Sequence, residues 1–272
     1  MRRAPAPAKL NLALVVGPPG PDGKHDLTTV LQRLDLGDRV ALAPSPVLRV
    51  DGFAQDTLVR AALRSLAERA DVEPRWRATV TKRVPVAGGL GGGSSDAATA
   101  LRLANETLSE PLPPADLHEL AARLGADVPF FLRPGPQLGE GDGTILRLLE
   151  LPQDFWVVLL LPRGATKTST AAVYASFDAR DGADGYEERR AALLDGLARV
   201  RRPRDLAALP PNDLASSPYA DELRGLGAFR ADVTGAGPTV YMLFSRRRDA
   251  EAARTRVERL GQTWLTVPAW YG

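Results

Sequence analysis

A glycine-rich run in the first half of the chain constrains its fold more than any other feature. Five of the six residues from Gly88 to Gly93 are glycine. Glycine loses more backbone freedom on folding than any other residue, so this density indicates close approach to a ligand or positive φ angles. A strand-like alternating segment, Trp76–Val84, precedes the run, and an alanine-rich helical segment, Ser94–Leu108, follows it.

A glycine turn that opens a helix presents unpaired N–H groups and the positive end of the helix dipole to an anion. The run therefore predicts a phosphate-binding loop, and the alternative is a flexible linker or a tight turn. The sequence has no Gly-Lys-Ser/Thr triplet of the Walker type, and its glycines do not follow the dinucleotide spacing. Neither a P-loop NTPase nor a Rossmann dehydrogenase is expected.

Composition excludes several other classes of protein. The chain has 272 residues, no cysteine, only two histidines (His25 and His118) and a net charge of +2. Thiolate metal sites, disulfides, cysteine nucleophiles and histidine-rich metal sites are excluded. The arginines are scattered, so we expect no nucleic-acid partner. Only four of the 35 basic residues are lysine, which marks each as a position where arginine would not serve: Lys9, Lys24, Lys82 and Lys167.

The N-terminal region predicts a strand rather than a targeting segment. Lys9 and Asn11 interrupt its apolar residues, and Gly17-Pro18-Pro19 supplies no cleavage site of the small-x-small type. No apolar run approaches the roughly 20 residues of a membrane span. We therefore expect no membrane partner and a cytoplasmic location.

Hydrophobic periodicity predicts an α+β chain of two domains. We expect the boundary near residue 150, with residues 1–150 binding the nucleotide and residues 151–272 forming a ferredoxin-like α+β half on the substrate side. The expected strands are Pro5–Val16, short segments within Arg39–Val50, Arg75–Val84, Phe155–Pro162, Ala228–Thr234, Thr239–Phe244 and Trp264–Val267. The expected helices are Asp56–Arg69, Ser94–Leu108, Pro114–Leu124, Ser169–Phe177, Tyr186–Val200, Tyr219–Leu226 and Arg248–Leu260.

Three separated motifs together resemble the GHMP kinases. They are Pro7-Ala8-Lys9-Leu10-Asn11-Leu12, the glycine loop, and a second glycine turn, Thr234-Gly235-Ala236-Gly237-Pro238. The first motif, continued by Asp22-Gly23-Lys24-His25, is most similar to the 4-diphosphocytidyl-2-C-methyl-D-erythritol kinases. The resemblance covers essentially the whole chain. It implies the two-domain GHMP fold, with ATP and Mg²⁺ as cofactors.

The resemblance also implies roles for the glycine loop. The residues expected to bind ATP are Pro85, Gly88, Gly89, Leu90, Gly91, Gly92, Gly93, Ser94 and Ser95. Ser95 is the candidate metal ligand, and the other ligands of Mg²⁺ are not identified. Gly235 and Gly237 are expected to support the site from the second domain. Asp96 follows the loop, and we interpret it as a carboxylate favoured by the helix dipole.

Lys9 and Asp127 match the catalytic pair of the family. Asp127 would accept the proton of the attacking hydroxyl, and Lys9 would hold both groups in place. The alternative for Asp127 is a helix cap before Pro129, and that for Lys9 is a solvated strand residue. General-base help of this kind typically contributes about 10²–10⁴-fold.

Other matching residues are expected to bind the substrate. His25 would contact the cytosine edge, Asn11 a polar part of the substrate, and Thr170 and Tyr174 would line the same pocket. Tyr174 could instead be a core aromatic. The family usually has tyrosine where this chain has Lys24, so the lysine would cover the base or leave one face open.

The implied reaction is phosphorylation of the 2-hydroxyl of cytidine diphosphate-linked methylerythritol, in non-mevalonate isoprenoid precursor biosynthesis. One alternative is a GHMP kinase acting on homoserine or a mevalonate-type alcohol. Another is a non-catalytic nucleotide-binding module, against which the Lys9 and Asp127 pair argues. A small molecule is the expected partner, and we expect a monomer or a weak homodimer.

Overall fold

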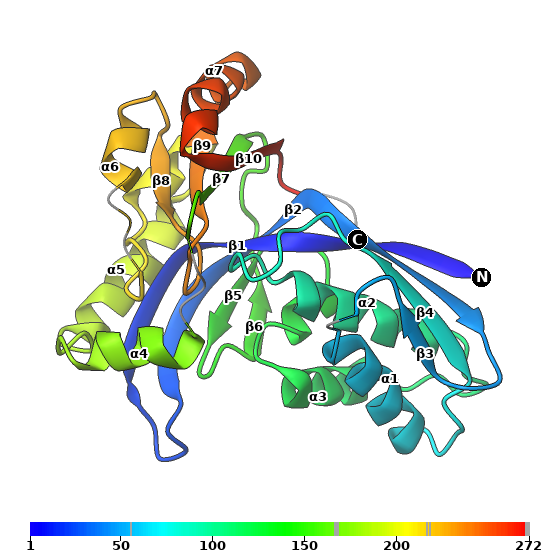
Figure 1. Cartoon of the computed structure of the whole chain (residues 1–272). Helices are drawn as coiled ribbons and strands as arrows, with labels where there is room; N and C mark the ends of the chain where they lie inside the picture. The colour runs from blue at the N-terminus through cyan, green and yellow to red at the C-terminus, as the bar shows by residue number, and fades with distance from the viewer. Residues whose placement is uncertain (55, 166–168, 216, 218, 270–272) are drawn as a thin grey trace.

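The computed structural model describes residues 1–54, 56–165, 169–215, 217 and 219–269. Within them lie two β-sheets with helices packed against each (Figure 1). Lys167, one of the four lysines singled out above, lies outside the described residues. Among the described residues, no helix combines the length and the apolar character that crossing a membrane requires.

The first sheet contains six strands and carries the glycine loop. Its order is β3-β4-β2-β5-β6, and β1 pairs with β2 outside this path. The strands are β1 (Arg2–Pro19), β2 (His25–Pro44), β3 (Arg49–Asp51), β4 (Trp76–Thr81), β5 (Gln137–Glu140) and β6 (Ile145–Leu148). The accompanying helices are α1 (Leu58–Arg69), α2 (Gly92–Asn105), α3 (Pro114–Leu124) and the 3₁₀ helix η1 (Pro129–Leu132).

Helix α2 forms the centre of this half. It packs on β1, β2 and β4, and α1 and α3 pack against it. Its alanines are buried, and they share a core with Leu63, Leu66 and Phe130. Small side chains let α2 lie close to the sheet, so the loop before it is fixed to a rigid element.

The second sheet has the order β10-β7-β9-β8, with every neighbouring pair antiparallel. Its strands are β7 (Trp156–Pro162), β8 (Arg230–Val233), β9 (Val240–Phe244) and β10 (Gly261–Thr266). Its helices are α4 (Thr170–Asp178), α5 (Tyr186–Arg199), η2 (Pro203–Ala208), α6 (Tyr219–Arg224), α7 (Arg247–Val257) and η3 (Glu258–Leu260). This strand order and the βαββαβ succession confirm the predicted ferredoxin-like half.

One hydrophobic cluster joins the two sheets. Leu10 and Leu12 of β1 share it with Leu159 of β7, Leu193 of α5 and Tyr241 of β9. In Figure 1, β1 and β2 run from the helices of the first half to those of the second. The domain boundary predicted near residue 150 falls between β6 and β7 and stays a prediction, because this core crosses it.

The strand prediction was wrong for β2 and missed β5 and β6. β2 is one continuous strand of 20 residues, whereas short segments were expected only from Arg39 onward. Residues 28–34 are buried on both faces, so they lack the alternation that identifies a half-buried strand. β5 and β6 have four residues each and are too short to produce a periodic pattern.

Candidate active site

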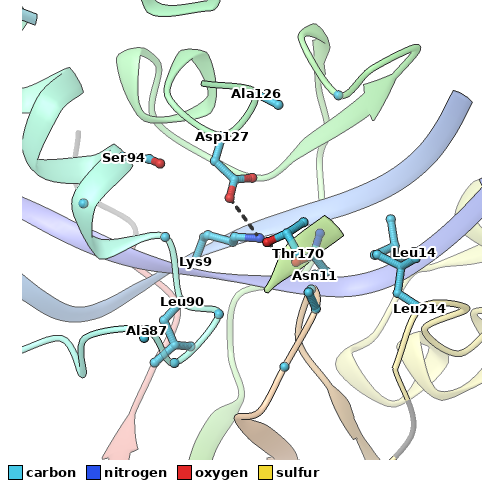
Figure 2. A pocket seen from close by; sticks show the side chains of 18 of the residues that line it. Lys9, Asn11, Leu14, Ala87, Leu90, Ser94, Ala126, Asp127, Thr170 and Leu214 are labelled. Carbon is cyan, nitrogen blue, oxygen red and sulfur yellow. Dashed lines mark hydrogen bonds and ion pairs between the residues drawn. The ribbon is translucent and has the colours of Figure 1, made fainter. Parts of the chain in front are cut away.

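A cavity of about 960 Å³ lies where the motifs meet (Figure 2). Its walls come from β1, the glycine loop, the β1–β2 turn, helix α4 and the second glycine turn. Nearly all the predicted site residues line it: Lys9, Asn11, Lys24, His25, Pro85, Gly88, Gly89, Leu90, Gly91, Gly92, Gly93, Ser94, Asp127, Thr170, Tyr174, Gly235 and Gly237. Segments far apart in the sequence therefore share one site.

Lys9 is buried in β1 and held by several contacts. Its Nζ donates to Asn11 Oδ1 at 2.7 Å and lies 3.5 Å from Asp127 Oδ2 (Figure 2). Its backbone N–H donates to Leu90 O at 2.9 Å, which ties the strand to the glycine loop. Lys9 is only 4% exposed, so the solvated-strand alternative is wrong.

Asp127 faces Lys9 from the segment after α3. Its side chain is 43% exposed, so the carboxylate is accessible from the cavity. The following 3₁₀ helix begins at Pro129 with Val128 at the N-cap position, and no side chain caps it. The helix-cap alternative for Asp127 is therefore wrong.

Asn11 connects the pair to the second half of the chain. Its Nδ2 donates to Thr29 Oγ1 at 2.8 Å, and its backbone N–H donates to Thr234 Oγ1 at 3.0 Å. A Cβ added to Gly235 would lie 3.3 Å from Asn11 Oδ1 and 3.5 Å from Lys9 Nζ. The second glycine turn thus approaches the Lys9 and Asn11 side chains closely.

The glycines of the first loop are also required by packing. Gly91, the N-cap of α2, has φ +68°, and a Cβ there would lie 2.9 Å from Lys9 Cγ. Gly89 has φ +80°, and its Cβ would lie 2.7 Å from Gly237 O and 2.9 Å from Thr234 O. Contacts this short leave no room for a side chain, so glycine at these two positions allows the loop to pack against β1 and the second glycine turn.

Ser94 and Ser95 differ in position. Ser94 lines the cavity at the start of α2, in the first turn, where free N–H groups favour an anion. Ser95 is fully buried and is not among the cavity-lining residues, and its Oγ has no hydrogen-bond partner among the described residues. Its predicted contacts to phosphate and metal stay predictions.

A buried charge cluster beside the loop was not predicted, and one of its members, Lys82, lines the cavity. Lys82 Nζ lies 2.8 Å from Asp96 Oδ2 and also donates to Asp38, whose Oδ1 accepts from Val84 N at 2.8 Å. Burial raises the pKa of Asp96 to about 7, aided by the neighbouring Asp38 carboxylate and opposed by Lys82. The carboxylates of Asp96 and Asp38 outweigh burial and raise the pKa of Lys82.

This cluster corrects the interpretation of Asp96. α2 begins at Gly92, two residues earlier than predicted, so Asp96 lies beyond its first turn and pairs with Lys82 instead of the helix terminus. The rarity of lysine was the only sequence signal for Lys82. The cluster ties β2 and the end of β4 to α2 across the glycine loop.

The opposite wall presents aromatic and charged groups. His25 Nε2 lies 2.8 Å from Asp178 Oδ1, and its ring centroid lies 4.7 Å from that of Tyr174. Tyr174 is partly buried, and burial, with the Asp127 carboxylate contributing, raises its pKa to about 12. It therefore lines the cavity rather than lying fully in the core.

Lys24 forms an ion pair at the edge of this wall. Its Nζ lies 2.6 Å from Asp142 Oδ2, in the turn between β5 and β6. This pair raises the pKa of Lys24 and lowers that of Asp142. The lysine thus connects the β1–β2 and β5–β6 hairpins at the cavity.

Comparison with known proteins identifies the family. The signature of the GHMP kinases N terminal domain matches residues 57–135, and that of the GHMP kinases C terminal domain matches residues 215–263. The chain is 37% identical to a 4-diphosphocytidyl-2-C-methyl-D-erythritol kinase of Geobacter sulfurreducens, over 92% of this chain and 94% of that protein. The chain belongs to the GHMP kinase family. The recognition made from the three motifs is thereby confirmed.

Further comparisons agree with this family. This kinase is 39% identical to a 4-diphosphocytidyl-2-C-methyl-D-erythritol kinase of Nocardia farcinica, over 88% of this chain and 83% of that one. A crystal structure of 4-(cytidine 5'-diphospho)-2C-methyl-D-erythritol kinase superposes with a TM-score of 0.79 at 29% identity, covering 98% and 99% of the two chains. A mevalonate kinase structure has a TM-score of 0.75 at 12% identity, over 98% of this chain and 99% of that one, and supports the fold alone.

Proposed function

We propose that this kinase transfers the γ-phosphoryl group of ATP to the 2-hydroxyl of 4-diphosphocytidyl-2-C-methyl-D-erythritol. Relatives of that name match nearly the whole chain. The observation that carries the proposal is one cavity lined by the glycine loop at the start of α2, a Lys9–Asp127 pair and an aromatic wall with His25. A homoserine or mevalonate kinase would have no need of the aromatic wall for a nucleobase.

The acceptor hydroxyl binds between Lys9 and Asp127. Phosphoryl transfer depends chiefly on positioning and on neutralising charge, so a fixed carboxylate beside a fixed ammonium suits the attacking group. Asp127 accepts the hydroxyl proton, and Lys9, held by Asn11, orients the carboxylate. Burial of Lys9 in β1 keeps its ammonium in position before the substrate arrives.

The glycine loop holds the donor phosphates. Backbone N–H groups at the start of α2 and the Ser94 hydroxyl supply donors next to the cavity. The dipole of α2 contributes typically about 0.3–1 kcal/mol per anionic contact. The second turn, with Gly235 and Gly237, closes the site beside Asn11.

Mg²⁺ fits this site mainly through the phosphates. No group of three or more acidic or histidine side chains suited to a metal occurs among the described residues. Mg²⁺ commonly keeps several waters and binds through few carboxylates plus phosphate oxygens. The ion would neutralise phosphate charge, with the Ser94 hydroxyl as a cavity-lining oxygen ligand at the start of α2. Ser95, the ligand expected from the sequence, is buried and does not line the cavity. A cytoplasmic location and a monomeric or weakly dimeric state also belong to this proposal.

A kinase assay across a panel of alcohols tests the proposal. We expect phosphorylation of the cytidine-linked methylerythritol and none of homoserine or mevalonate. Asp127→Ala should abolish transfer while ATP binding survives, because the carboxylate lies on the acceptor side of Lys9. Asp116→Ala, in α3 and paired with Arg69 away from the cavity, is the matched control. Near-normal turnover by Asp127→Ala, or a preference for homoserine, would contradict the proposal.

A further inference from the structure

His25 is held by one helix, α4. Its Nε2 lies 2.8 Å from Asp178 Oδ1, and its ring contacts Tyr174 at 4.7 Å and Phe177 at 5.9 Å between centroids. The His25 side chain is only 8% exposed, although the residue lines the cavity. The imidazole is therefore fixed in orientation by groups within five residues of one another along the chain.

Asp178 is not explained by helix stability. It is the last residue of α4, where the helix dipole is negative and a carboxylate is disfavoured. Its side chain is 48% exposed, and among the described residues its carboxylate contacts His25. An acidic residue at this position is consistent with a function in holding the histidine.

The contact with Asp178 determines the tautomer of His25. A carboxylate only accepts hydrogen bonds, so Nε2 carries the proton and donates it to Oδ1. A neutral imidazole with Nε2 protonated has an unprotonated Nδ1, which is a hydrogen-bond acceptor. No hydrogen bond from the described residues reaches Nδ1, so this acceptor is available to a ligand.

An acceptor at this place distinguishes two pyrimidines. Cytosine carries an amino group at C4, which donates, whereas uracil carries a carbonyl oxygen there, which accepts. Building on the cytidine substrate proposed above, we propose that Asp178 is a positioning residue for base specificity. It fixes His25 so that Nδ1 accepts from the cytosine amino group and opposes the uracil carbonyl.

Nitrogen-15 NMR of the imidazoles tests the tautomer in the free protein. The chain has only two histidines, so two sets of ring signals are expected. His118 Nε2 lies 3.0 Å from Thr144 O, and a carbonyl also only accepts, so His118 is an internal reference for the Nε2–H form. At about pH 9, where imidazoles are neutral, we expect both histidines to give the Nε2–H pattern. An Nδ1–H pattern for His25 overturns the inference.

Asp178→Asn tests the effect on specificity. The amide both donates and accepts, so it no longer imposes one tautomer, and His25 should give mixed signals. The ratio of kcat/KM for cytidine- over uridine-linked substrate should fall about 10- to 100-fold, through KM with kcat retained, since one hydrogen bond to the base is involved. Asp181→Asn is the matched control, because it removes the same charge three residues later, and the polar and aromatic contacts of His25 among the described residues do not include Asp181.

The two proposals fail in different ways. If the wild type does not phosphorylate the cytidine-linked alcohol, the proposed function is wrong, while the NMR result still reports on Asp178 and His25. If the wild type is active and Asp178→Asn keeps both the base ratio and the pure Nε2–H pattern, the inference about Asp178 is wrong. A fall in the ratio of equal size in Asp181→Asn also overturns it.

Discussion

Gly89→Ala separates two explanations of the glycine loop. If glycine is needed at this position only for a close approach to ATP, alanine should weaken nucleotide binding and leave stability unchanged. The structure instead places the missing Cβ 2.7 Å from Gly237 O and 2.9 Å from Thr234 O, in a residue with φ +80°. Both contacts are shorter than real Cβ atoms make, so the loop and the second turn would have to separate.

The expected loss of stability has two parts. A left-handed conformation costs a residue other than glycine about 1–2 kcal/mol. Overpacking against fixed backbone adds typically about 1–3 kcal/mol. The sum of roughly 2–5 kcal/mol lowers Tm by about 4–20 °C for a chain of this size, at 2–4 °C per kcal/mol.

Gly93→Ala is the matched control in the same loop. Its Cβ would meet only Leu58 Cδ1 at 3.5 Å, an ordinary contact, within the first turn of α2. Because alanine is a better helix former than glycine, this variant should gain about 0.5–1 kcal/mol. Thermal unfolding of both variants without nucleotide is the assay. A Gly89→Ala protein with wild-type Tm and weakened ATP binding would refute the packing explanation.

Three further predictions concern charged residues of the site. Lys9→Arg should lower kcat at least about 100-fold in the kinase assay. The buried lysine stem lies against Gly91, so a wide guanidinium does not fit. Turnover like that of the wild type would contradict this prediction. Asp96→Asn should stabilise the fold above pH 7. Burial makes the charged form of Asp96 costly, which raises its pKa to about 7, so the gain in unfolding free energy should grow as pH rises from about 4 to 7. Denaturant unfolding at pH 5 and pH 8 measures this gain, and an equal or larger gain at pH 5 would argue against the linkage. Lys24→Tyr should lower KM for the cytidine-linked substrate and leave Tm unchanged, because the ion pair with Asp142 is solvated; a higher KM would indicate that Lys24 itself binds substrate.

Local sequence was sufficient to predict the elements that carry strong local signals. The glycine loop follows from its local composition, and the ferredoxin-like half follows from the succession of strands and helices. The pairing of Lys9 with Asp127 was expected only from the resemblance to the GHMP kinases. β2 could not be identified, because a strand buried on both faces has no period-two pattern.

Other side-chain contacts between residues far apart in the sequence could not be predicted from the sequence. Asp38 lies in β2, Lys82 directly follows β4 and Asp96 lies in α2, and no local pattern relates them. Asp178 was missed for the same reason, since its contact is with a residue 153 positions earlier. The glycines were found but explained incompletely, because the close approach of the second turn to Gly89 is visible only in three dimensions.

The position of Lys9 in β1 has a consequence for how the protein is made. Asn11 N–H bonds to Thr234 across 223 residues, and the Tyr241 hydroxyl donates to Leu12 O across 229. Contacts of such sequence separation are slow to form and come late in synthesis from the N-terminus. Lys9, the proposed catalytic lysine, is therefore synthesised more than 200 residues before the second glycine turn and β9, which complete its surroundings. A nascent chain that stops before β8 lacks Thr234 and Tyr241 and cannot form this candidate site.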